Sequence, residues 1–286
     1  MTNQFQQLFL RKSGVPISEM IELFGFGLAI LIGLLLSLLG GGGSILTVPV
    51  LVYVFGIEPA LATAYSLFIV GVSSLVGSLN YLRQGLASPK TALFFSFPSF
   101  VMVYLMRKLV MPHIPNEVIR VGEFVLTKNL LIMSVFALTM VLASSSMIRG
   151  KKGINEDLET LREQLNYPLI FVEGLLVGCL TGFVGVGGGF LIVPVLTVML
   201  KVPMKFAVGT SLMIITINSL MGFLGDVGNH ATDWTFIGKF VGLSIIGVFI
   251  GSYLSKFLNN RQLKPAFGWL TLVMGLWILG KELLLK

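Results

Sequence analysis

Long runs of apolar residues, separated by short polar stretches, dominate the pattern of this chain. No Asp, Glu, Lys or Arg occurs between Leu23 and Ile57, and residues 129–148, 174–200 and 206–225 are equally free of charged side chains. A helix needs about 20 apolar residues to cross the hydrocarbon core of a bilayer. The alternating segments that are typical of a transmembrane β-barrel do not occur. The pattern therefore predicts an all-α integral membrane protein.

The apolar segments form two sets of five. The second segment of each set is too short to span alone, since the 11 residues from Ile45 to Phe55 make about 16 Å of helix against roughly 30 Å of hydrocarbon. Each half is therefore expected to contain a re-entrant hairpin or a Gly-broken helix, with about eight to ten membrane segments in all. The predicted segments are residues 21–39, 45–56, 60–82, 91–110 and 124–148, then 167–184, 190–200, 205–225, 235–257 and 265–284.

Composition supports the membrane interpretation. The 286 residues are 55% hydrophobic and 12% charged, whereas soluble domains carry about 25% charged residues. The net charge of +7 comes from Lys and Arg that lie mostly at segment ends, where they can contact phospholipid head groups, so the expected partner is the lipid bilayer and not a nucleic acid. Cys179 is the single cysteine, which excludes an intrachain disulfide. The first apolar run is too long for a signal peptide, so we expect none to be cleaved.

The two halves of the chain match each other when one is shifted by 145 residues. Gly40 then aligns with Gly185, and residues 40–80 contain 16 identities in 41 pairs. The helix before each match has a small residue at every fourth position, a spacing that lets two helices approach closely in lipid. These small residues are Ala29, Gly33 and Ser37 in the first half and Gly174, Gly178 and Gly182 in the second.

This match predicts two homologous membrane repeats. Residues 1–20 form an N-terminal arm, residues 21–148 the first repeat, residues 149–166 a charged linker and residues 167–286 the second repeat. If each repeat crosses the membrane an odd number of times, the repeats are inverted. If each Gly-broken stretch crosses only once, they are parallel. We favour inversion, because facing helix ends then arise from symmetry.

A glycine cluster follows the first segment of each half, as GGGGSILTVP from Gly40 and GVGGGFLIVP from Gly185. Each glycine costs a helix roughly 1 kcal/mol relative to alanine, so the clusters predict unwinding at residues 40–44 and 185–189. The helix that follows would offer free N–H groups to a small anion. The alternative is that the glycines only permit tight packing. The predicted substrate-binding residues here are Gly40, Gly41, Gly42, Gly43, Ser44, Gly185, Gly187, Gly188 and Gly189.

Polar side chains inside the apolar segments are further candidates for substrate binding. Ser66 aligns with Ser211 under the same shift, and Thr210 and Asn218 lie nearby in the second half. Hydroxyls and amides can donate hydrogen bonds to an oxyanion without burying a full charge. The alternative is that they bond their own helix backbone or a neighbouring helix.

Few ionisable residues fall inside the predicted segments. Arg83 ends the third segment, where it is a candidate gate or a lipid anchor. His230 and Asp233 lie in the loop GDVGNHATDW and are candidates for proton coupling, because histidine titrates near neutral pH, although a solvated loop is the alternative. Glu22 and Glu173 lie near segment ends and are expected at the membrane interface.

The spans contain no nucleophile–base pair and no set of metal ligands. The sequence therefore predicts no catalytic residue, no metal, no cofactor and no enzyme activity.

The paired glycine clusters resemble the TauE/SafE permease family, whose members are also called sulfite exporters. The resemblance lies in GGGGSILTVPVLV from Gly40 and in GFVGVGGGFLIVPVLTVML from Gly182 with its VGTSL continuation. The loop ending in HATDW is similar to the family's His-Gly-X-Ile-Asp turn, but Ala231 and Thr232 depart from it.

This resemblance covers residues 21–284 and implies a multi-pass permease of the cell inner membrane. The implied substrate is a small anion, mostly a sulfur compound such as sulfite or sulfoacetate. The implied site consists of the two glycine clusters with Ser66, Thr210 and Ser211. We expect alternating access, with an anion channel or a proton-coupled carrier of another small organic anion as the alternatives.

Overall fold

The computed structural model describes residues 17–121, 124–149, 167–185, 188–199, 202–226, 232–258 and 260–284. Residues 150–166 of the predicted linker and residues 1–16 of the predicted arm lie outside the described residues. The helices of the first half are α2 (Ile17–Leu39), α3 (Gly42–Tyr53), α4 (Pro59–Arg83), α5 (Pro89–Leu105), its π-helical continuation η1 (Met106–Val110), α6 (Met111–His113) and α7 (Lys128–Arg149). Those of the second half are α9 (Tyr167–Val184), α10 (Gly189–Pro194), its π-helical continuation η2 (Val195–Met199), α11 (Met204–Asp226), α12 (Trp234–Leu254) and α13 (Asn260–Leu284).

The helices follow the order of the predicted apolar segments. Two shorter apolar helices are Gly42–Tyr53 and Ile170–Val184. Large apolar side chains such as Phe94 on α5 and Phe249 on α12 remain exposed on the bundle, as lipid-facing positions require. The prediction of an all-α integral membrane protein is confirmed. The 6 described helices that are long and apolar enough to cross a membrane are Glu22–Leu39, Pro59–Arg83, Pro89–His113, Lys128–Ser145, Met204–Asp226 and Trp234–Leu254.

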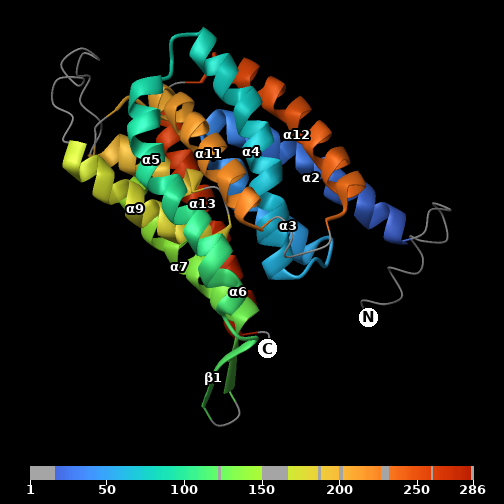
Figure 1. The fold of residues 1–286 in the computed structure, drawn as a ribbon. Helices are drawn as coiled ribbons and strands as arrows, with labels where there is room; N and C mark the ends of the chain where they lie inside the picture. Colours follow the sequence, from blue (N-terminus) through green and yellow to red (C-terminus); the bar gives the residue numbers. More distant parts are fainter. Residues whose placement is uncertain are drawn as a thin grey trace.

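Within the described ranges, a short β-hairpin is the exception to the helical architecture. Strand β1 (Glu117–Val121) pairs antiparallel with β2 (Phe124–Thr127), and the hairpin projects from the helical bundle in Figure 1. The sequence pattern predicts one apolar segment over residues 124–148, but the helix begins at Lys128. Aromatic and β-branched residues favour strands, and a run of four residues is too short to show a period.

Helices from the two halves are interleaved. The most extensive helix contacts join α2 to α12, α7 to α13, α4 to α11 and α5 to α9. Figure 1 shows α2 and α12 running side by side along one edge of the bundle. Residues 21–148 and 167–286 therefore build one common hydrophobic core, which contains Leu36 and Phe95 from the first half and Ile215 and Phe267 from the second.

Small residues at these helix contacts allow close approach. On α2, a Cβ at Gly33 would overlap the backbone of Ser244 on α12, and the hydroxyls of Ser37 and Ser252 lie 2.7 Å apart one turn further on. The packing role that the sequence assigned to this spacing is thus seen directly. On α9, the glycines that lie against α5, with no room for a side chain, are Gly174, Gly178 and Gly182.

Helices α4 and α11, which align under the 145-residue shift, pack antiparallel. Gly77 near the end of α4 faces Leu212 near the start of α11, and Gly222 near the end of α11 faces Leu67 on α4. Two aligned helices of opposite direction therefore pack against each other, and both carry buried hydroxyl groups.

Helix α3 folds back along α2. A Cβ at Gly43, in the first turn of α3, would overlap Ile32 and Leu36 of α2, and the ring of Phe55 after α3 lies against Gly25 near the start of α2. The first glycine cluster is therefore the tip of a helical hairpin, which was one of the two arrangements predicted.

Candidate functional site

The first glycine cluster interrupts the helix over two residues, Gly40 and Gly41. Gly40 has φ +69°, a conformation that residues with side chains rarely adopt, and Gly41 caps the next helix. The helix α3 begins at Gly42, so the unwound stretch is shorter than the predicted residues 40–44. Gly42, Gly43 and Ser44 form the first turn of α3 and are buried, and the Ser44 hydroxyl donates to the carbonyl of Gly41 at 2.6 Å.

The second glycine cluster separates helix α9 from helix α10. Gly185 and Gly188 have positive φ, +74° and +73°, and the helix α10 begins at Gly189. The amide of Gly185 closes the last turn of α9 by donating to the carbonyl of Thr181 at 2.7 Å. The predicted site residue Gly187 lies outside the described residues.

The two breaks touch each other at the interface between the halves. A Cβ at Gly41 would overlap backbone atoms of Gly189, and a Cβ at Gly189 would come within 2.6 Å of the Cα of Gly41. Each break also packs against the central helix of the other half, since Gly40 lies against Ser211 and Gly185 lies against Thr63. The structure thus brings the two predicted clusters together, with Ser211 beside the first.

The aligned serines Ser66 and Ser211 differ in their contacts. The hydroxyl of Ser211 lies 2.7 Å from the Gly40 carbonyl and 2.8 Å from that of Val208, and its single proton can be donated to either. The hydroxyl of Ser66 is fully buried and has no hydrogen-bond partner. Ser211 therefore holds the first break in place, whereas the donor of Ser66 is unused.

Two polar bridges join the central helices to their neighbours. Asn218 donates through Nδ2 to the Ser99 hydroxyl at 2.7 Å, and the aligned Ser73 donates to Ser244 at 3.0 Å. The amide oxygen of Asn218 is buried without a partner. Thr210 accepts a hydrogen bond from the backbone of Ser88 at 3.1 Å, so it fixes the start of α5 and lies in the interface between the halves.

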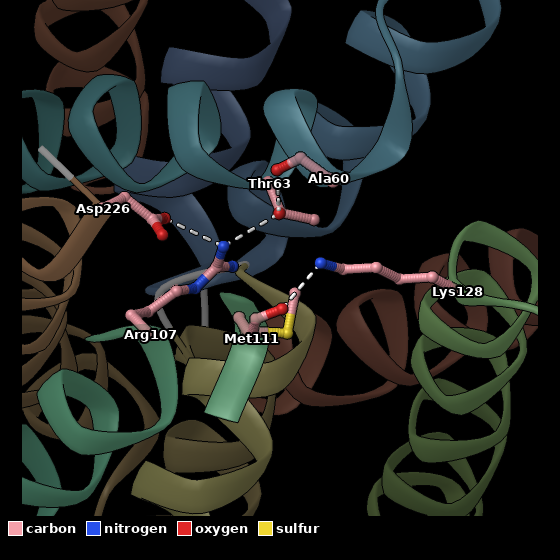
Figure 2. A network of polar contacts seen from close by, with 6 residues as sticks. All are labelled: Ala60, Thr63, Arg107, Met111, Lys128 and Asp226. Atoms are coloured by element: carbon pink, nitrogen blue, oxygen red, sulfur yellow. Dashed lines mark hydrogen bonds and ion pairs between the residues drawn. The ribbon is translucent and has the colours of Figure 1, made fainter. Parts of the chain in front are cut away.

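A buried ion pair lies beside the second break. Arg107 is 1% exposed, and its Nη1 donates to Oδ2 of Asp226 at 2.9 Å and to the Thr63 hydroxyl at 3.0 Å. Figure 2 shows the guanidinium reaching between Asp226 and Thr63. A Cβ at Gly185 would overlap both Nη2 of Arg107 and the side chain of Thr63, so only glycine allows the break to lie this close.

The sequence pattern does not predict this pair. The pattern predicts a polar loop at Asp226, but Asp226 is the last residue of α11 and is buried. Arg107 has no predicted role, although it lies inside the predicted apolar segment 91–110. A charged residue within a span is the signal that would have drawn attention to it. Its partner lies 119 residues away, and no local pattern joins the two.

The other ionisable candidates lie apart from the ion pair or outside the described residues. Arg83 is exposed at the end of α4, and His230 is not among the described residues. Glu173, expected at the interface, is 6% exposed, and its carboxylate oxygens have no hydrogen-bond partner. Asp233 caps α12, since its side chain accepts from the amide of Phe236 at 3.0 Å.

A cavity of about 480 Å³ opens beside Asp233. Of the predicted site residues that the structure describes, Asp233 alone lines it. Its walls are mainly apolar and aromatic and carry the carboxylates of Glu22 and Asp233, which would repel an anion. Its lining residues are Glu22, Val54, Phe55, Ile57, Leu61, Tyr65, Asp233 and Phe236.

Replacing the aligned serines by alanine should affect stability unequally. Ser211→Ala removes the donor to the Gly40 carbonyl, and a buried polar group left without its partner costs about 1–3 kcal/mol. Ser66→Ala removes a buried hydroxyl that has no partner, so the free energy of unfolding should stay the same or rise. Reversible denaturation of both variants in detergent measures the difference. Equal losses of stability would contradict the assignment of these contacts.

An interleaved bundle of apolar helices with paired breaks at its centre is a multi-pass membrane protein, and comparison with known proteins identifies it as a transporter. The model of the family described as sulfite exporter TauE/SafE matches residues 25–278, and the chain belongs to this family.

Similar proteins bear transporter names. A probable membrane transporter protein of Xylella fastidiosa is 28% identical over 262 residues, which cover 88% of this chain and 92% of the relative. The probable membrane transporter protein YdhB of Bacillus subtilis is 24% identical over 249 residues, which cover 87% of this chain and 96% of the relative. A probable membrane transporter protein of Methanocaldococcus jannaschii is 34% identical over 107 residues, which cover 35% of this chain and 40% of the relative. No solved structure matches the chain.

Proposed function

We propose that this transporter moves a small anion, a sulfur oxyanion or organosulfonate such as sulfite or sulfoacetate, across the cell inner membrane. The observation that carries the proposal is the buried guanidinium of Arg107 beside the second glycine break. An ionisable residue in a membrane span marks a substrate or ion pathway by default. A positive charge suits an anion, and the unused hydroxyl of Ser66 lies one helical turn along α4 from the residue that contacts this charge.

The surroundings of Arg107 support an anion in preference to a cation. Thr63 contacts the guanidinium, and Ser66 lies three residues further along α4, on the same face of that helix. Among the described residues, no three His, Cys, Asp or Glu side chains gather where they could hold a metal ion. Asp226 neutralises the guanidinium, so the substrate has to share or replace this contact.

Alternating access follows from the symmetry that we propose for the two halves. The central helices α4 and α11 align in sequence and pack antiparallel, which favours inverted repeats over parallel ones. In inverted repeats the substrate lies near the midplane between them, and rocking of one repeat against the other exposes it to each side in turn. In the present conformation the breaks at Gly41 and Gly189 are in contact, so this contact has to open during the cycle.

An anion channel and a proton-coupled carrier are the competing functions. The close contact of the glycine breaks favours a carrier, because a channel needs a continuous open pore through the same interface. The buried carboxylate of Glu173, which has no hydrogen-bond partner, favours proton coupling among the carriers.

Uptake into proteoliposomes tests the proposal. Vesicles containing the purified protein should accumulate radiolabelled sulfite or sulfoacetate with saturable kinetics and show counterflow, with thiosulfate and acetate as comparison anions. Imposing a pH gradient should change the sulfite rate if transport is proton-coupled. Absence of flux for all four anions, or flux that does not saturate, would contradict the proposed function.

A further inference from the structure

The guanidinium of Arg107 uses only part of its hydrogen-bonding capacity. Arginine carries five N–H donors in a rigid, planar arrangement. The contacts with Asp226 and Thr63 both engage Nη1. Nε and Nη2 are buried and have no hydrogen-bond partner. One complete edge of the guanidinium, with two parallel donors, is therefore unused in the protein interior.

We infer that the Nε–Nη2 edge of Arg107 is a bidentate site for an oxyanion group, namely sulfite or the sulfonate or carboxylate of an organic anion. This inference rests on the proposed function and names the part of the substrate that the protein recognises. A guanidinium edge binds two oxygens of one planar or pyramidal group through parallel N–H···O bonds, which a halide cannot accept in the same way. Burial strengthens these bonds because little water competes for them.

Two features of the backbone lie beside the Nε–Nη2 edge of Arg107, a π-helical turn and the second glycine break. Arg107 lies in the π-helical turn Met106–Val110 at the end of α5, and such wide turns inside α-helices occur frequently at functional sites. The positive-φ residue Gly185 lies against Nη2, and a Cβ there would overlap this nitrogen. The second glycine break thus lies directly against the unused edge of the guanidinium, and this links the sequence motif to the charge that the motif alone did not reveal.

The equivalent place in the other half carries no charge. Under the 145-residue shift, Arg107 aligns with Ser252 and Asp226 aligns with Tyr81. There, Ser252 hydrogen-bonds Ser37 at 2.7 Å, and the Tyr81 hydroxyl donates to the Ser37 carbonyl at 2.8 Å. In that network the hydroxyls of Ser37, Ser252 and Tyr81 are all hydrogen-bonded, whereas Nε and Nη2 of Arg107 have no hydrogen-bond partner. The asymmetry points to one oxyanion site per chain.

Asp226 acts as an internal anion at this site. Its carboxylate holds the guanidinium in place, and it also opposes a second negative charge on the neighbouring edge. Neutralising Asp226 should therefore tighten oxyanion binding, whereas replacing the planar fork by an ammonium group should weaken it. These two effects have opposite signs, so they separate binding geometry from general damage to the protein.

Calorimetric titration of the full-length protein in detergent tests the inference with sulfite, methanesulfonate and chloride as probes. In Arg107→Lys, which keeps the charge but loses the fork, the affinity for sulfite and methanesulfonate should fall at least about tenfold while that for chloride changes by less than about threefold. Asp226→Asn should bind sulfite more tightly than the wild type. Lys108→Arg, an exposed change in the same turn, is the matched control and should bind like the wild type.

Three outcomes would overturn the inference. The first is wild-type affinity for sulfite in Arg107→Lys, provided that thermal unfolding shows the variant to be folded. The second is an equal loss for sulfite and chloride, which would mean that charge alone matters. The third is sulfite binding that weakens in Asp226→Asn. If the wild type transports sulfite in vesicles while any of these holds, the proposed function stands and only the site is wrong. If the wild type neither binds nor transports the anions, the proposed function fails.

Discussion

Gly41→Ala and Gly189→Ala should each reduce anion flux at least tenfold. A Cβ at Gly41 would overlap backbone atoms of Gly189, and a Cβ at Gly189 would overlap the break around Gly41. Backbone cannot move aside as a flexible side chain can, so a single methyl group forces the two breaks apart. Overpacking of this kind costs about 1–3 kcal/mol, and here it acts on the contact that has to open and close during transport. Initial rates of sulfite uptake in vesicles measure the effect.

Two helix glycines with free space around them serve as matched controls. A Cβ at Gly238 or Gly242 of α12 would meet no atom within 4 Å, so alanine at either position should leave the rate within about twofold of the wild type. Gly42→Leu should give a flux between these two groups of variants, because the atoms nearest to a side chain at position 42 belong to the side chain of Leu39 in the same hairpin. Wild-type flux in both Gly41→Ala and Gly189→Ala would show that the contact between the breaks is not part of the transport cycle.

Arg107→Met should destabilise the protein by about 3–5 kcal/mol and abolish flux. The substitution leaves the buried carboxylate of Asp226 without its cation, and breaking a buried pair from one side typically costs this much. The double variant Arg107→Met/Asp226→Leu removes both charges, and apolar replacement of a complete pair is often neutral for stability. We therefore expect the double variant to regain most of the free energy of unfolding while its flux remains absent. Denaturation in detergent and uptake in vesicles measure the two properties separately.

The double variant is the decisive member of this series. If it is stable and still transports sulfite, the ion pair has only a structural role. If it remains as unstable as Arg107→Met, Arg107 contributes through packing of its aliphatic stem and not through the charge pair.

The order and class of the helices could be predicted because hydropathy reports the environment of each segment directly. The hairpin Glu117–Thr127 could not, since Phe124 to Thr127 are as apolar as the helix that follows. The break at Gly40 could be predicted because four glycines weaken a helix. Its extent could not, because packing of Gly43 against Ile32 and Leu36 extends α3 back to Gly42.

The candidate site was only partly visible in the sequence. The glycine clusters and Ser211 could be predicted because they occur in both halves, and aligning the two halves with a 145-residue shift detects such duplication. Arg107 and Asp226 align with Ser252 and Tyr81, so the repeat pattern conceals them. Their pairing depends on α5 and α11 meeting in space, and tertiary contact over 119 residues leaves no trace in local composition. The charged part of the site is therefore the part in which the two halves differ.

The most direct test is the position of selenite in crystals of the protein, because selenite has the shape and charge of sulfite and its selenium can be located by anomalous scattering. The account predicts a selenium peak beside Arg107 and Gly185, with selenite oxygens about 2.7–2.9 Å from Nε and Nη2. A peak in the cavity lined by Glu22 and Asp233, or at any place remote from Arg107, would contradict it.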